Sequence, residues 1–166
     1  GRDVMPKAGF WAIGGAEISF GSDGIWYADG ESIANRRIAE LFSRHICRGD
    51  DGDWVIDIGI DRQTVRVDDT PLVVVAVDGD GTAGFTVRCN DGIIGPLDPS
   101  SLAVGDGEVL YCEVDRGERG PMPARFLRPA YYALARSMTV AGDAAVLETG
   151  GRRYRVARRP TLRSCE

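Results

Sequence analysis

The sequence has few of the residues that build metal sites. It contains one histidine, His45, and four cysteines without a Cys-x-x-Cys pair among its 166 residues. A single histidine excludes zinc sites that require two or three, and the scattered cysteines give neither a zinc motif nor a redox motif. We therefore predict no metal and no cofactor, and expect reduced structural thiols at Cys47, Cys89, Cys112 and Cys165.

Long hydrophobic runs are also missing. No stretch of about 20 apolar residues exists, and residues 1–15 lack the basic start and long apolar core of a signal peptide. A cytoplasmic protein without a membrane segment is expected, and a leader removed ahead of Gly1 is left open. The glycines do not form the G-x-x-x-x-G-K-S/T loop that cradles phosphates.

Lysine is nearly absent, with Lys7 as the only one among 20 basic residues, and the net charge is −5. The arginine bias indicates a GC-rich bacterial genome, a hypothesis that codon usage would test. Because phosphate contacts need a concentrated positive field, the acidic balance makes the whole chain a poor nucleic-acid binder.

Residues 24–46 organise the first part of the chain as strand, turn and helix. Trp26 and Ala28 alternate with their neighbours, Asp29-Gly30 gives a turn, and Ser32 is a suitable helix N-cap. The helix is expected to end near Cys47, with one face formed by Ile38, Leu41, Phe42 and His45. A partly buried core histidine accounts for His45.

Strand patterns dominate the remainder. A short strand at 17–20 precedes the organising stretch, and four runs predict an antiparallel meander at 54–58, 64–67, 72–77 and 85–89. Residues 90–107 are rich in turn signals and predict a connection. A strand at 109–114, a polar turn at 115–121, a helix beginning at Pro129 and reaching Met138, and a hairpin of 145–147 with 154–157 should follow.

The pattern of the first part recurs. A shift of 93 residues places the apolar helix positions of the first part over Tyr131, Leu134 and Ala135, and a shift of 91 aligns the strands that follow. We predict an α+β fold in one compact unit of two related halves, each a helix packed on antiparallel strands. Convergence on a common pattern is the alternative. The expected boundaries are 1–20 for a lead-in and first strand, 21–90, 91–107 as connection, and 108–166.

Five short motifs follow one another along the chain: Asp23-Gly24-Ile25-Trp26-Tyr27 with Gly30 and Ile33, Leu41-Phe42-Ser43, Val67-Asp68-Asp69-Thr70-Pro71, Cys89-Asn90-Asp91, and Tyr131-Tyr132-Ala133-Leu134. In this order and spacing they resemble the bacterial family of unknown function DUF1285. The resemblance covers about residues 20–156 and implies an α+β fold of repeated motifs, a conjectured link to signal transduction, and no assigned catalytic residue. The sequence departs from the family pattern at residues 58–62, where Ile-Gly-Ile-Asp-Arg stands in place of a Thr-Pro-x-Glu-Lys turn.

Carboxylates are the candidate groups for acid–base chemistry. Asp68 and Asp69, with Asp61 across the expected hairpin, could divide acid and base roles. Adjacent strand residues face opposite ways, however, and Thr70-Pro71 favours a turn. The Asp78-x-Asp80-Gly81 string is read as a turn, since an EF-hand would need Glu where Cys89 stands.

Arginines form the densest charge cluster near the C-terminus. Strand alternation favours a solvated face with a tail, and an acidic partner or RNA is the alternative. On the first helix, Arg37 is expected to pair with Glu40 or Glu31, or to lie along the apolar stripe. The cluster comprises Arg152, Arg153, Arg155, Arg158 and Arg159, with Arg163 beyond it.

These observations favour a non-enzymatic binding or regulatory module that recognises a small molecule or a protein at the seam between halves. No nucleophile and base are placed together by the sequence, so no catalytic residue is predicted. The alternatives are a small hydrolase or isomerase with Asp61 or Asp69 as base, and an RNA-associated protein. The oligomeric state is left open. The predicted ligand-binding residues are Arg37, Asp61, Asp68, Asp69, Asn90 and Asp91.

Overall fold

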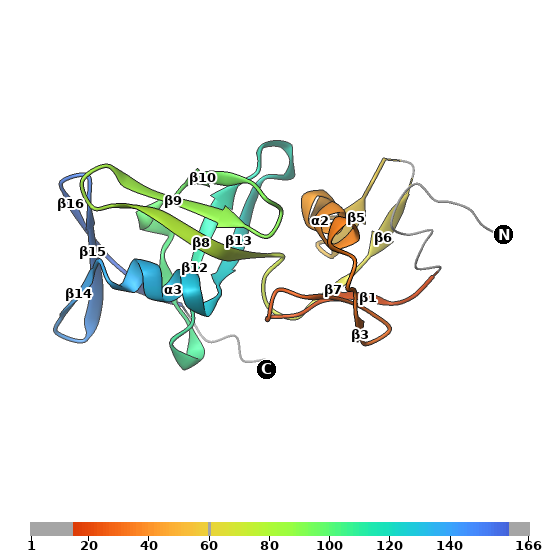
Figure 1. The fold of residues 1–166 in the computed structure, drawn as a ribbon, viewed down its shortest axis with the longest axis horizontal. Coiled ribbons are helices and arrows are strands. Elements are labelled where there is room, and N and C mark those ends of the chain that lie inside the picture. Colours follow the sequence, from red (N-terminus) through yellow and green to blue (C-terminus); the bar gives the residue numbers. More distant parts are fainter. Residues whose placement is uncertain (1–14, 60, 160–166) are drawn as a thin grey trace.

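The computed structural model describes residues 15–59 and 61–159. The described chain is a mixed α+β fold of two lobes lying side by side along the long axis (Figure 1). We call residues 15–71, without residue 60, the N-lobe, and residues 72–159 the C-lobe. The expected lead-in before Gly15, Arg163 and Cys165 lie outside the described residues.

The N-lobe has two small sheets and one helix. Its first sheet has the order β3-β2-β1-β7, in which β7 runs parallel to β1. The helix continues directly into the second, antiparallel sheet of order β4-β5-β6. The elements are β1 (Ile18–Phe20), β2 (Trp26–Ala28), β3 (Glu31–Ser32), α2 (Arg36–His45), β4 (Ile46–Arg48), β5 (Trp54–Asp57), β6 (Arg62–Thr64) and β7 (Arg66–Val67).

The C-lobe is built on a seven-stranded sheet of order β10-β9-β8-β13-β12-β11-β17. Helix α3 leads into a separate three-stranded sheet, β14-β15-β16. The elements are β8 (Leu72–Asp80), β9 (Gly84–Cys89), β10 (Ile94–Pro96), η1 (Pro99–Ser101), β11 (Ala103–Val104), η2 (Asp106–Glu108), β12 (Leu110–Asp115), η3 (Gly117–Arg119), β13 (Pro121–Phe126), α3 (Arg128–Ala135), β14 (Met138–Ala141), β15 (Ala144–Thr149), β16 (Arg152–Arg155) and β17 (Ala157–Arg158).

One strand order occurs twice. The sheet β3-β2-β1-β7 has the same connectivity as the segment β13-β12-β11-β17 of the large sheet. In each, a helix and a three-stranded antiparallel sheet precede the last strand, which pairs in parallel with the first. The common connectivity does not by itself confirm the predicted pair of related halves, since convergence also produces recurring α+β patterns.

The predicted four-stranded meander is wrong. The runs at 54–58 and 64–67 contribute to β5, β6 and β7, whereas those at 72–77 and 85–89 form β8 and β9 in the large sheet. Strand β8 pairs with β9 on one side and in parallel with β13 on the other, so it is the buried central strand that its apolar run predicts. The segment 91–107, expected as a connection, contributes β10 and β11 to the same sheet.

Both ends of the first helix differ from the expectation. Asn35 is the N-cap, because its Oδ1 accepts hydrogen bonds from the backbone N–H groups of Arg37 and Ile38 at 2.9 and 3.2 Å. Ser32 instead pairs with Tyr27 in the β2–β3 ladder. The helix ends at His45, and Ile46–Arg48 pairs with β5 as strand β4. His45 is partly buried, as expected.

In the C-lobe, α3 ends at Ala135, and Met138 begins a strand instead of extending the helix. Pro129 lies in the first helical turn, as predicted. The hairpin across Gly150-Gly151 is confirmed as β15 with β16. The sequence does not predict strand β13, because Pro121 and Pro123 argue against a strand in this sheet interior.

The two lobes share one hydrophobic cluster. Phe20, Trp26 and Phe42 of the N-lobe and Leu72 and Val74 of β8 belong to it, and all five are at most 2% exposed. The Trp26 ring lies tilted at 4.7 Å from Phe20 and edge-on at 5.4 Å from Phe42, measured between ring centroids. The continuous core makes the protein compact. Neither described helix is long and apolar enough to cross a membrane.

Candidate functional site

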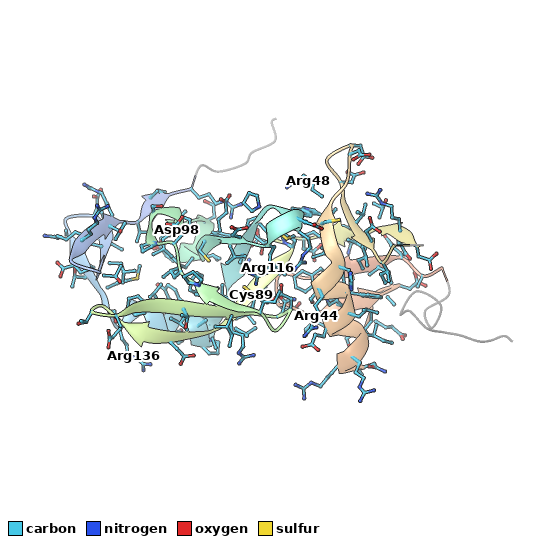
Figure 2. The ribbon with its side chains drawn as sticks, turned by 90° about the horizontal axis from the view of Figure 1, so that it is seen from above. Arg44, Arg48, Cys89, Asp98, Arg116 and Arg136 are labelled. Atoms are coloured by element: carbon cyan, nitrogen blue, oxygen red, sulfur yellow. The ribbon has the colours of Figure 1, made fainter. Side chains whose placement is uncertain are left out.

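A buried ion-pair cluster lies where the lobes meet, close to Arg44 and Cys89 in Figure 2. Asp91, fully buried after β9, accepts hydrogen bonds from Arg116 Nε and Nη2 at 2.8 and 3.1 Å. Arg119 Nη2 reaches the same carboxylate at 3.1 Å. Burial acts to lower the pKa of Arg116, but the hydrogen bonds and charge of Asp91 outweigh it and leave that pKa raised.

Arg119 also binds the N-lobe. Its Nη1 donates to the carbonyl oxygens of Ser43 and Ile46 at 3.0 and 3.1 Å, at the C-terminal end of α2. A cation at this position supplies hydrogen-bond donors to carbonyl groups that have no partner within the helix, and its charge is favourable at the negative end of the helix dipole. Arg44 Nε donates in the opposite direction, to the carbonyl of Asp91 at 3.3 Å. The Asp91 cluster therefore fastens α2 to the C-lobe.

A second polar joint is centred on Ser43 in α2. Its Oγ accepts from Trp26 Nε1 at 2.9 Å and from Asn90 Nδ2 at 2.7 Å, and donates to the Ala39 carbonyl at 2.9 Å. Asn90 Oδ1 in turn accepts from the Val73 N–H at 2.9 Å. The side chains of Asn90 and Asp91, expected to bind ligand, thus have hydrogen-bond partners within the protein.

Asp69 has a different environment. Its Oδ2 accepts from Arg125 Nη1 and from the Tyr111 hydroxyl, both at 2.7 Å. Burial, followed by the hydrogen bond to Asp69, raises the pKa of Tyr111. The Arg159 guanidinium lies 3.9 Å above the Tyr111 ring. Asp69, which also accepts from Tyr111, therefore fixes the position of Arg125.

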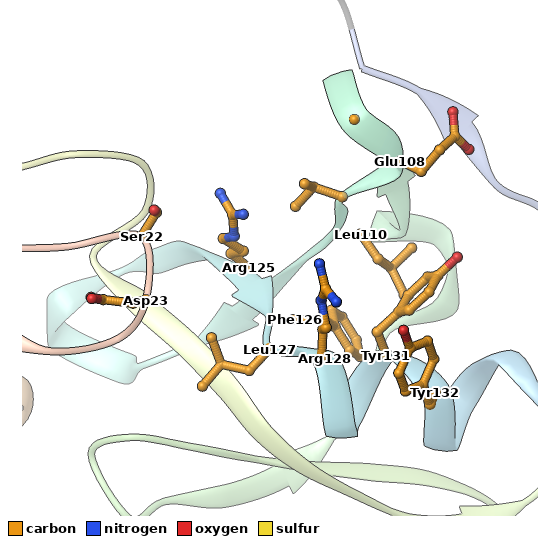
Figure 3. A pocket seen from close by; sticks show the side chains of 12 residues that line it. Ser22, Asp23, Glu108, Leu110, Arg125, Phe126, Leu127, Arg128, Tyr131 and Tyr132 are labelled. Atoms are coloured by element: carbon orange, nitrogen blue, oxygen red, sulfur yellow. The ribbon is translucent and has the colours of Figure 1, made fainter.

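Arg125 lines a cavity of about 470 Å³, which we call the α3 cavity. In Figure 3 the β1–β2 turn contributes Ser22 and Asp23, α3 contributes Arg128, Tyr131 and Tyr132, and Arg125 of β13 lies between the two groups. Leu127 adds apolar surface, while Leu110 and Phe126 lie almost fully buried behind the lining. The lining of the cavity is more polar than apolar, with charged groups of both signs beside two tyrosine rings.

The start of α3 presents two kinds of binding group. Arg128 is exposed and has no hydrogen-bond or ion-pair partner in the described part of the chain. Tyr132 is 55% exposed, and its ring centroid lies 5.6 Å from that of Tyr131. A guanidinium beside aromatic rings can bind an acidic group and contact a flat or apolar body at the same time.

The acids around this cavity are already engaged. Asp23 Oδ2 accepts from the Tyr27 hydroxyl at 2.7 Å, and Glu108 lies 3.4 Å from Arg158 Nη2. His45 belongs to α2 and does not line the α3 cavity. The geometry therefore offers binding groups more readily than a general base.

A second cavity, the α2 cleft, has a volume of about 540 Å³ between α2 and strands β8 and β9. It is lined by Arg37 and Asn90, the only pair of predicted ligand-binding residues that share one of the described cavities. Arg37 is exposed and does not form the expected pair with Glu40 or Glu31.

The other two predicted carboxylates are separate. Asp68 follows β7 and lies 3.4 Å from Arg66, near a smaller cavity of about 320 Å³ that also includes Asp23. Asp61 precedes β6, where its Oδ2 is shielded and has no hydrogen-bond partner in the described residues. The six predicted residues therefore do not form one site.

The C-terminal arginines are spread over two elements. Arg153 on β16 lies 3.5 Å from Glu148 of the neighbouring strand. Arg158 and Arg159 on or after β17 contact Glu108 and Tyr111 near the α3 cavity. Arg152 and Arg155 are exposed on β16. An RNA role for this cluster stays a prediction.

The described thiols are buried or partly buried and unpaired. Burial raises the pKa of Cys89 to about 11 and also raises the pKa values of Cys47 and Cys112. No cluster of three or more His, Cys, Asp or Glu side chains suited to a metal occurs in residues 15–59 and 61–159.

Sequence reasoning missed Arg116, Arg119, Arg125, Arg128 and Tyr111. Nineteen of the 20 basic residues are arginine, so residue type singles out none of them. The partners of Asp91 and Asp69 come from β12–β13 and lie 25 to 56 positions away. The position of Arg128 beside Pro129 at a helix start was the one available signal.

Two comparisons find no counterpart, since the sequence matches no protein-family model and no curated protein. Two solved structures are similar. A DUF1285 family protein from Silicibacter pomeroyi DSS-3 has 17% identity and a TM-score of 0.62, over 86% of this chain and 80% of the other. A DUF1285 family protein from Shewanella baltica OS155 has 21% identity and a TM-score of 0.58, over 74% and 92%. At these identities the likenesses show the fold alone: the chain has the fold of these two DUF1285 family proteins, the family that its motifs resemble.

Proposed function

We propose that this protein is a non-enzymatic binding module that takes a small organic acid into the α3 cavity. The observation that carries the proposal is the geometry of Arg125. Asp69, itself bound by Tyr111, holds Arg125 in place at the cavity, and Arg128, whose side chain has no partner among the described residues, lies in the same wall. A carboxylate or phosphate can accept parallel hydrogen bonds from a guanidinium, and a fixed arginine loses less freedom on binding.

The remainder of the ligand is apolar or flat. Leu127 forms apolar wall, and Tyr131 and Tyr132 offer ring surface. The volume of about 470 Å³ falls within the range of small-molecule sites. The favoured ligand class is therefore an acid with an aromatic or aliphatic body, in preference to a free inorganic anion.

A regulatory role follows from where the cavity lies. Ser22 and Asp23 come from the N-lobe, and the other lining residues come from the C-lobe. A ligand that contacts both sides would favour one arrangement of the lobes over others. We also infer that residues 18–67 and 103–158 are two copies of one unit, supported by their common strand order, which makes the region between them a seam.

The enzymatic alternative is a hydrolase or isomerase with Asp69 as base. Both donors of Asp69, Arg125 and Tyr111, bind the same carboxylate oxygen, Oδ2. A substrate would have to displace at least one of them before that oxygen could accept a proton. Asp61 lies in the β5–β6 turn and lines none of the described cavities.

A thermal-shift screen with aromatic carboxylates, aliphatic carboxylates and organic monophosphates tests the proposal. A ligand at 100 times its Kd adds about 2.7 kcal/mol, which should raise the Tm by roughly 5 to 10 °C for a chain of this size. Arg128→Gln should remove most of the rise. Arg136→Gln is the matched control, because Arg136 is exposed just after the same helix and lines neither cavity.

Two results would contradict a binding module of this kind. One is the absence of a shift from any acid, and the other is an equal shift in wild type and Arg128→Gln. Hits are incubated further and followed by mass spectrometry, since conversion of the ligand that depends on Asp69 would favour the enzymatic alternative.

A further inference from the structure

The α2 cleft differs from the α3 cavity in its charge. Arg36 and Arg37 from the first turn of α2 and Arg88 from β9 line it. We propose that the α2 cleft is a second, independent site for a small molecule that carries two or more phosphate groups.

The three arginines are not neutralised. None of their side chains has a hydrogen bond or ion pair within the described residues. The one acid in the cleft, Glu40, lies 3.9 Å from Arg44, a cation outside the cleft lining. The cleft thus concentrates positive charge in a chain whose net charge is −5. Such local fields attract anions into a concave surface.

Helix stability does not account for two of these arginines. The positive end of the helix dipole favours Asp and Glu in the first turn, but the first turn of α2 contains no acidic residue and begins with Arg36 and Arg37. Like charges at this position cost stability unless an anion compensates them. Arg88 comes from the other lobe, so residues far apart in sequence converge on one cavity.

Phosphate matches these groups best. The planar guanidinium pairs with two phosphate oxygens at once, so three arginines can serve more than one phosphate. The volume of about 540 Å³ exceeds the need of a single inorganic phosphate and suits a small organic molecule. Single-stranded RNA would require exposed stacking surface, and the one aromatic residue that lines the cleft, Trp26, is 2% exposed.

A ligand in the cleft would also contact both lobes. Arg36, Arg37 and Ser43 belong to α2, whereas Arg88 and Asn90 belong to or follow β9. Ser43 and Asn90 are the two members of the interlobe hydrogen bond of 2.7 Å. Binding would therefore affect the Ser43–Asn90 hydrogen bond, which fixes α2 to the C-lobe.

Isothermal titration calorimetry with inorganic tripolyphosphate, and separately with orthophosphate, provides the test. Wild type should bind tripolyphosphate more tightly than orthophosphate, with affinity that falls as salt rises. Arg88→Gln should weaken tripolyphosphate binding by about tenfold or more, since a charged hydrogen bond is removed. Arg37→Gln should act in the same direction. Arg88 is exposed, so folding should persist, which circular dichroism verifies.

The controls separate the two sites. Arg128→Gln should leave tripolyphosphate binding unchanged, because Arg128 lines the α3 cavity and not the α2 cleft. Equal weakening by Arg136→Gln would indicate non-specific charge attraction and overturn the proposal, as would unaltered binding by Arg88→Gln. A labelled RNA oligonucleotide that binds more tightly than tripolyphosphate, with the same dependence on Arg88, would overturn the small-molecule assignment.

Discussion

The two Asp residues at positions 68 and 91 show how burial decides what a carboxylate contributes. Asp68 and Arg66 form a pair at 3.4 Å with side chains 48% and 62% exposed. Asp91 and Arg116 form a pair at 2.8 Å with side chains 0% and 5% exposed. Water screens the first pair, whereas the second has lost its hydration and depends on its partner.

Asp91→Asn should therefore destabilise the protein far more than Asp68→Asn. Removing the buried charge leaves two arginines without their carboxylate, a loss of about 3 to 5 kcal/mol, and the surface pair contributes at most about 1 kcal/mol. Urea denaturation of both variants measures the difference. Equal losses would show that the Asp91 cluster does not hold the lobes together.

The sequence pointed to Asn90 and Asp91 but not to their role. Both follow a strand with alternating apolar residues, and this marks them as polar groups at a strand end. The partners of Asp91, Arg116 and Arg119, lie at the start and end of the η3 turn, a segment read only as polar, and Asn90 pairs with Ser43 of α2. Pairing across the fold depends on how the sheets assemble, which local spacing does not encode. For the same reason the sequence predicts neither the α3 cavity nor the α2 cleft.

Among the elements, the β1–β2 turn contributes to both cavities. It contributes Ser22 and Asp23 to the α3 cavity and Gly24 to the α2 cleft. Gly24 has φ of +82°, and a Cβ there would lie 3.0 Å from Val73 Cγ2 and 3.5 Å from Leu127 Cδ1. Glycine at this position thus permits both the turn and its close contact with the C-lobe.

Gly24→Ala and Gly30→Ala form a matched pair. Gly30, in the next turn, has φ of +84°, but a Cβ added there would have no neighbouring atom within 4 Å. Both variants should lose about 1 to 2 kcal/mol from the positive φ, and Gly24→Ala should lose more because Val73 must move. The Tm of each variant gives the comparison. A Gly24→Ala loss no larger than that of Gly30→Ala would contradict close packing of the turn.

Element type was more predictable than pairing. Alternation and apolar runs located β2, β5, β8 and β9, and Pro129 located the start of α3. Hairpin signals then favoured a meander, but the parallel contact of β8 with β13 joins segments about 50 residues apart. Burial of the whole sheet face stabilises such contacts, and a short segment of sequence does not show which distant strand completes that face.

Across the whole molecule, one hydrophobic cluster runs through both lobes. The Asp91 and Ser43 hydrogen bonds connect the lobes through α2. A shared core of this kind should unfold as one cooperative unit, even though the sheets are separate.

Two spectroscopic probes can test that cooperativity. Trp26 and Trp54 belong to the N-lobe, and residues 72–159 contain no tryptophan, so fluorescence does not report directly on the C-lobe, while far-ultraviolet circular dichroism reports on both lobes. In urea the two probes should give the same midpoint for wild type. Distinct midpoints would show that the lobes unfold separately and that the interlobe contacts add little.

The parallel pairing of strands β7 and β17 with the earlier strands β1 and β11 affects how the chain folds. Ser19 pairs with Arg66 and Ala103 with Ala157, so each β-β-β-helix unit is completed only when its last strand returns to its first. Contacts between residues so far apart in the sequence slow folding, because the intervening chain must be ordered before they form. During synthesis the first unit can close once residue 67 has emerged. The hydrogen bond between Ser43 and Asn90 cannot form until Asn90 has been synthesised. The nascent N-lobe therefore acquires its final stability only after the C-lobe begins to form.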